Sequence, residues 1–99
     1  MISQYQKNIT NVELLYILYL KMEQKINELI ILLKKNKNIE NSKKINDIKN
    51  ILFEVFDILI NNTNNKELKN IYIYLMNKIS SNNIDNIKIV LNFCKNSKK

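Results

Sequence analysis

The acidic residues are the side chains of this chain that could perform acid–base chemistry or bind a metal ion. The 99 residues contain nine Asp and Glu and no histidine, which is the commonest general base and metal ligand. Glu54 and Asp57 are three positions apart, so on a helix they share one face and could form a paired carboxylate site. We favour a solvated helix face on which these acids balance nearby lysines. The sequence therefore predicts no catalytic residue, no metal site and no enzyme.

Tyrosine and cysteine are the other side chains with reactive groups. Tyr16, Tyr19, Tyr72 and Tyr74 lie in apolar stretches, where tyrosines more often line a core or a groove than act in catalysis. Cys94 is expected to be a small core residue, and a single cysteine excludes a disulfide framework. Glycine is absent, so the chain cannot form a glycine-rich phosphate loop, and we expect no cofactor.

Composition and charge bound the class of partner. Asn, Lys and Ile supply more than half of the chain, a bias that suggests an A+T-rich genome. The net charge of +7 would ordinarily favour nucleic acid or an anionic membrane. Every basic residue is a lysine, however, and arginine, which forks onto phosphates and guanine edges, is absent. We therefore consider nucleic acid an unlikely partner and favour a solvated lysine-rich surface.

The sequence predicts neither a signal peptide nor a membrane span. The N-terminus lacks a charged region followed by an apolar run. The segment 12–20 is apolar apart from Glu13, but its nine residues are too few to cross a bilayer. We expect no membrane insertion and a soluble protein in the cytoplasm.

Four stretches repeat an apolar residue every three or four positions, which is the period of an amphipathic helix. We predict one all-α domain over 1–99, with an N-terminal arm at 1–10, an antiparallel four-helix bundle at 11–95 and a basic tail at 96–99. The predicted helices span 11–34, 43–60, 65–80 and 83–95. The stripes expected to form the core are Leu15–Leu18–Met22–Ile26–Leu29–Leu33, Ile45–Ile48–Leu52–Val55–Leu59, Leu68–Tyr72–Leu75–Ile79 and Ile84–Ile87–Leu91–Cys94.

Polar residues indicate where two of these helices begin. Asn41 or Ser42 can cap the second helix, because their side chains accept hydrogen bonds from free backbone N–H groups. Asn64 and Glu67 form a capping pattern before the third helix.

The helices carry more apolar side chains than one buried face needs. The surplus set is Leu14, Ile17, Leu20, Ile51, Phe53, Ile58, Ile73, Met76, Ile89, Val90 and Phe93. A small bundle that buries one stripe per helix leaves such a set facing water, and large exposed apolar patches usually mark a partner site. The sequence therefore predicts a bundle that holds an apolar partner.

Several motifs, in order along nearly the whole chain, resemble those of FliS, the flagellin-specific export chaperone family. They are Tyr5, Asn8 and Ile9 in the arm, Asn11-Val12-Glu13-Leu14-Leu15 leading to Leu18-Tyr19, Ser42-Lys43-Lys44-Ile45, Ile71-Tyr72-Ile73-Tyr74-Leu75-Met76, Asn82-Asn83 and Asp85-Asn86. The resemblance implies an antiparallel bundle that binds the disordered C-terminal segment of flagellin, prevents premature polymerisation and delivers flagellin to the flagellar export gate. It also implies that the arm can cover part of the binding groove when no client is bound.

The residues expected in this groove or arm follow from the surplus set together with the resemblance. They are Tyr5, Ile9, Leu14, Ile17, Leu18, Tyr19, Ile51, Ile73 and Met76. We expect the free chain to be a monomer or a weak homodimer. Two alternatives stay open, namely a basic helical nucleic-acid-binding protein and a structural helical homodimer.

Overall fold

The computed structural model describes residues 12–35 and 39–97, and these residues form four α-helices and no strand. The helices are α2 (Val12–Lys34), α3 (Ile39–Asn61), α4 (Lys66–Ser80) and α5 (Ile84–Ser97). The predicted all-α four-helix bundle is therefore confirmed. The predicted arm at 1–10 lies outside the described residues.

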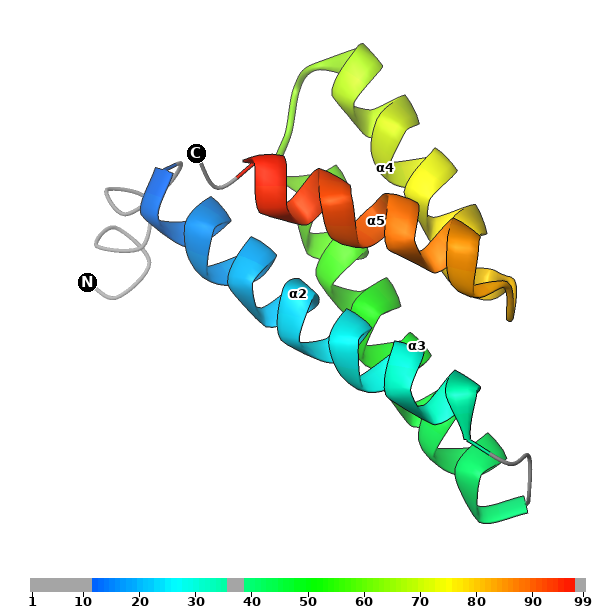
Figure 1. The fold of residues 1–99 in the computed structure, drawn as a ribbon. Coiled ribbons are helices and arrows are strands. Elements are labelled where there is room, and N and C mark those ends of the chain that lie inside the picture. Colours follow the sequence, from blue (N-terminus) through cyan, green and yellow to red (C-terminus); the bar gives the residue numbers. More distant parts are fainter. Residues whose placement is uncertain (1–11, 36–38, 98–99) are drawn as a thin grey trace.

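The helices pack as two antiparallel pairs (Figure 1). α2 packs against α3 and α5, and α4 packs against α3 and α5. Across the described residues, the backbones of the two diagonal pairs, α2 with α4 and α3 with α5, do not approach each other. α2 and α3 have 23 residues each, whereas α4 and α5 have 15 and 14. Figure 1 shows that the C-terminal end of α2 and the N-terminal end of α3 extend beyond the shorter pair.

The predicted stripes form most of the hydrophobic core. Their buried members are Met22, Ile26, Leu29, Ile48, Leu52, Val55, Leu59, Tyr72, Leu75, Ile79, Ile87, Leu91 and Cys94. Stripe residues near the helix ends, such as Leu18 and Leu68, are partly buried and pack against this core. Leu15 is different: it was expected in the core and is 36% exposed.

Four further buried residues, Tyr19, Ile30, Phe56 and Val90, complete the core. Val90 was assigned to the surplus set and is fully buried, so that assignment was wrong. Each helix contacts two neighbours, and two contacts bury a wider arc of the helix than a single stripe. Phe53 and Phe93, which were also assigned to the surplus set, are partly buried against the core because of this wider arc.

The helix boundaries differ from the predicted ones at the start of α3 and at the end of α5. α3 begins at Ile39 rather than at 43, so Asn41 and Ser42 lie inside the helix and do not cap it. Asn and Ser are only moderately unfavourable in a helix, and the segment has no Gly or Pro to stop it. α5 continues to Ser97, so the first half of the predicted tail is helical.

Asparagine side chains cap the two shorter helices. Asn65, and not Asn64, caps α4, because its side-chain oxygen accepts a hydrogen bond of 3.1 Å from the backbone N–H of Leu68. Asn83 makes the equivalent contact before α5, where its side chain accepts from the N–H of Asn86 at 3.2 Å. These caps satisfy N–H groups that have no partner within their own helix.

Candidate functional site

Large apolar side chains are exposed on all four helices. They are Leu15, Tyr16, Ile17, Leu20 and Ile31 on α2, Ile58 on α3, Ile71, Ile73 and Tyr74 on α4, and Ile89 on α5. Five of them, Ile17, Leu20, Ile58, Ile73 and Ile89, belong to the surplus set that the sequence predicted to face water. Single apolar residues are ordinary on a protein surface. A concave site lined by apolar side chains is stronger evidence for a binding site.

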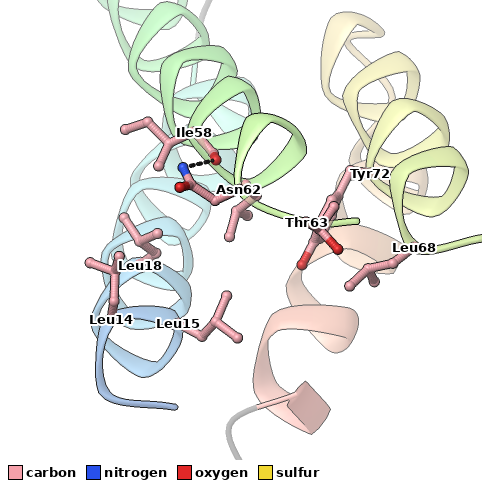
Figure 2. Close-up of a pocket in the computed structure, with 9 residues that line it drawn as sticks. Leu14, Leu15, Leu18, Ile58, Asn62, Thr63, Leu68 and Tyr72 are labelled. Atoms are coloured by element: carbon pink, nitrogen blue, oxygen red, sulfur yellow. Dashed lines mark hydrogen bonds between the residues drawn. The ribbon is translucent and has the colours of Figure 1, made fainter. Parts of the chain in front are cut away.

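Such a hollow, which we call the Leu15 pocket, opens where α2, α3 and α4 meet, at the open end of the α2–α3 hairpin (Figure 2). Its lining residues are Leu14, Leu15, Leu18, Ile58, Leu59, Asn62, Thr63, Leu68 and Tyr72. The cavity measures about 140 Å³. An apolar cavity of about 150 Å³ can hold a benzene molecule, so the Leu15 pocket matches one Leu or Phe side chain of a partner.

The polar groups of the Leu15 pocket are engaged with the protein itself. The side-chain amide of Asn62 donates to the carbonyl oxygen of Ile58 at 2.7 Å, as Figure 2 shows. The hydroxyl oxygen of Thr63 accepts from the backbone N–H of Asn65 at 3.3 Å. The pocket is therefore better suited to an apolar group than to a charged ligand.

Tyr72 connects the pocket to a polar contact inside the core. Its hydroxyl lies 2.7 Å from the hydroxyl of Tyr19, and both residues are buried. The ring of Phe93 packs edge-on against both tyrosine rings, with centroid separations of 5.9 and 6.3 Å. Burial raises the pKa of Tyr19 far above its usual range, and the hydrogen bond to Tyr72 raises it further. Burial also raises the pKa of Tyr72, so both hydroxyls stay protonated at neutral pH.

A second, shallower hollow lies between α2 and α3, and we call it the Ile31 groove. It measures about 410 Å³ and is lined by Ile31, Leu32, Ile48 and Ile51, with Lys25, Glu28, Lys44 and Asp47 beside them. Ile31 is 55% exposed. Lys25 and Glu28 form an ion pair of 3.3 Å near the surface, where such pairs contribute little to stability.

The residues expected to bind a partner do not form a single groove. Leu14 and Leu18 line the Leu15 pocket, and Ile51 lines the Ile31 groove. Ile17 and Ile73 are exposed on α2 and α4, whereas Met76 is partly buried against the core and Tyr19 is 5% exposed inside it. Tyr5 and Ile9 lie outside the described residues.

Among the side chains whose burial the structure describes, Lys49 is the one buried charged residue, and it is 8% exposed. Its Nζ donates to the carbonyl oxygens of Ser80 and Ser81, at 3.3 and 3.2 Å, and to Oδ1 of Asn82 at 2.6 Å. Burial lowers the pKa of Lys49. Since an ammonium group has three N–H donors, these acceptors occupy all of them. We call this contact the Lys49 clamp. No pattern in the sequence separates Lys49 from the other lysines.

Paired carboxylates and a metal site are the remaining chemical candidates. Glu54 and Asp57 are exposed on α3. Between residues 12 and 35 and between 39 and 97, no three Cys, Asp or Glu side chains are grouped as a metal ion would require. Among the four helices, none is long and apolar enough to cross a membrane.

Comparisons of the chain with protein-family models, with curated proteins and with solved structures find no match.

Proposed function

We propose that the protein is a cytoplasmic export chaperone that binds the disordered C-terminal segment of flagellin. In this role it prevents premature polymerisation and delivers flagellin to the flagellar type III export apparatus. The observation that carries the proposal is the apolar Leu15 pocket, two of whose lining residues, Leu15 and Ile58, are themselves exposed apolar side chains. The motifs that resemble FliS indicate which client this surface holds.

The distribution of exposed apolar residues favours an extended client over a compact one. A disordered segment loses conformational entropy when it binds, so it needs a long contact surface to compensate. Ile17 on α2, Ile73 on α4 and Ile89 on α5 provide apolar contacts on three helices. A chain that wraps around the bundle can reach such separated contacts, and the Leu15 pocket can anchor one of its apolar side chains.

The test is calorimetric titration with a peptide that contains the C-terminal segment of flagellin, followed by circular dichroism of the mixture. We expect one peptide per chain and a gain of helix by the peptide. The comparison ligand is duplex DNA. If DNA binds and is released by salt while the peptide does not bind, the nucleic-acid alternative replaces this proposal.

The Ile31 groove favours a structural homodimer as the second candidate function. The chain carries a net charge of +7, which opposes self-association in general. Around Ile31 and Ile48, however, the groove has two lysines and two acids, so its charge is balanced. Sedimentation of the isolated chain tests this candidate. A dimer that Ile31→Asp converts to monomer supports it, and a monomer at every concentration tested excludes it.

A further inference from the structure

We infer that α4 can rotate about its C-terminal end, which the Lys49 clamp holds, and that its N-terminal end moves away from the Leu15 pocket when the Tyr19–Tyr72 hydrogen bond breaks. We call α4 in this role the flap, its C-terminal end the hinge and the Tyr19–Tyr72 hydrogen bond the catch. The proposal concerns a movement of the chain by itself and does not depend on flagellin as the client.

The hinge end of α4 is fixed by the Lys49 clamp and by the turn that follows. The clamp places a positive charge on the carbonyl groups of Ser80 and Ser81, where the helix dipole is negative. The hydroxyl of Ser81 donates to the carbonyl of Lys78 at 2.8 Å and accepts from the side-chain amide of Asn86 at 3.3 Å. The turn is thus bonded to α3, α4 and α5 together.

The opposite end of α4 is packed loosely. No side chain between residues 66 and 71 is buried, and Leu68 is only partly buried. The buried residues of α4 are Tyr72, Leu75 and Ile79, which lie further toward the clamp. Leu68 and Tyr72 form the α4 wall of the Leu15 pocket. Part of the space beneath this end of the helix is therefore a cavity.

The catch is the hydrogen bond between one side chain of α2 and one of α4. Tyr19 belongs to α2 and Tyr72 to α4, a diagonal pair whose backbones do not approach each other in the described residues. A bond between two neutral hydroxyls is roughly half as strong as one made by a charged group. The Tyr19–Tyr72 bond is consequently the weaker of the two polar attachments.

The length of α4 turns a small rotation at the hinge into a larger movement at the pocket. Leu68 lies twelve residues before Ser80, which is about 18 Å along a helix that rises about 1.5 Å per residue. Tyr72 is about 12 Å from the same point. A rotation about the clamp therefore moves Leu68 most, separates the two hydroxyls and widens the Leu15 pocket.

Residue-resolved amide hydrogen exchange in the wild-type chain, measured at several low urea concentrations, is the first test. Local opening exposes less surface than global unfolding, so its rate depends less on denaturant. Short helical segments without tertiary packing are marginal in water, so the turns of α4 that lift away from the bundle should open their backbone hydrogen bonds. We therefore expect the amides of residues 69–73 to exchange with a weaker urea dependence than those of residues 76–80. Equal urea dependence at both ends of α4 would overturn the hinge.

Two variants separate the catch from the clamp. Tyr72→Phe keeps the ring and removes the hydroxyl, so it is expected to raise exchange at residues 69–73 about fivefold. Lys49→Met removes a contact that persists when the flap opens. It should raise exchange at residues 76–80 while changing residues 69–73 less than about twofold. If each variant raises the rate of amide exchange by the same factor at residues 69–73 and at residues 76–80, α4 opens only with the whole bundle and the proposal is wrong.

A milder variant covers the case in which Lys49→Met does not fold. Asn82→Ala removes one of the three acceptors of the clamp, that at 2.6 Å, and Asn82 is exposed. It is expected to raise exchange at residues 76–80 but not at residues 69–73. The reverse pattern would place the hinge at the other end and contradict the proposal.

Discussion

The hydroxyls of Tyr19 and Tyr72 lie 2.7 Å apart and join α2 to α4 across the bundle, although the backbones of these two helices do not meet within the described residues. Each ring also packs against Phe93 of α5. Three helices are thus joined by one cluster of aromatic side chains. Tyr72 lines the Leu15 pocket, so the contact that joins the helices also forms part of the surface proposed to hold the client.

Removing one hydroxyl of the pair should destabilise the fold. Tyr19→Phe leaves the buried hydroxyl of Tyr72 without its partner, so we expect the free energy of unfolding to fall by about 1–3 kcal/mol. The double variant Tyr19→Phe/Tyr72→Phe should be no less stable than either single variant, because it leaves no unpaired hydroxyl. Urea denaturation of the three variants measures the coupling, and strictly additive losses would show that the two hydroxyls do not interact.

Raising the pH above about 10 should weaken the fold through the same pair. The folded pKa values of Tyr19 and Tyr72 lie above the ordinary value of 10.0. The unfolded chain therefore loses protons that the folded chain keeps, and stability that is complete below this pH is lost above it. Each tyrosine lowers the free energy of unfolding by up to about 1.4 kcal/mol per pH unit.

Urea denaturation at several pH values between about 9 and 11 checks this dependence. Tyr19→Phe should lose stability less steeply than the wild-type chain above pH 10. Lys49, whose pKa is lowered, acts in the opposite direction between its folded pKa and its ordinary value of 10.5. It is present in both proteins, so its effect cancels in the comparison. Identical slopes would contradict the prediction.

The core itself is tested by Leu52→Ala. Leu52 is fully buried near the middle of α3, so its truncation should lower the free energy of unfolding by about 2–5 kcal/mol. Ile17→Ala, on the exposed face of α2, is the matched control and should cost less than about 0.5 kcal/mol. Urea denaturation gives both values. A loss below about 0.5 kcal/mol for Leu52→Ala would place the core on another face.

The N-terminal arm is proposed to compete with the client for the same surface. Deleting residues 2–9 removes Tyr5 and Ile9, so the deletion should strengthen binding of the flagellin peptide or speed its association. It should also increase the fluorescence of a dye that binds apolar surface. Weaker peptide binding without a rise in dye fluorescence would mean that the arm contacts the client and does not cover the groove.

The helical core could be predicted from the sequence because its signal is local. Met22, Ile26 and Leu29 repeat at helical spacing, and that period alone predicts a buried face. The same local signal could not identify Phe56 or Val90 as core residues, because their burial depends on which two helices become neighbours.

The polar contacts inside the bundle could not be predicted, because they depend on tertiary distance. Nothing in the sequence distinguishes Lys49 from the exposed lysines, and it is buried only because the α4–α5 turn lies against it. Tyr19 was predicted to line a groove, yet α5 and α4 enclose it beside Phe93 and Tyr72. The exposed residue Leu15 was predicted to be buried, and its exposure follows from the cavity beside it.

The most direct test of the proposed chaperone function is calorimetric titration with the C-terminal flagellin segment in about 0.5 M salt, a concentration that screens charge contacts strongly. We expect one-to-one binding by the wild-type chain and by Ile31→Asp, whose change lies in the Ile31 groove. Leu15→Asp places a charge in the Leu15 pocket and should weaken binding at least about tenfold, or about 1.4 kcal/mol. Absence of binding by the wild-type chain, or equal binding by Leu15→Asp, would contradict the account.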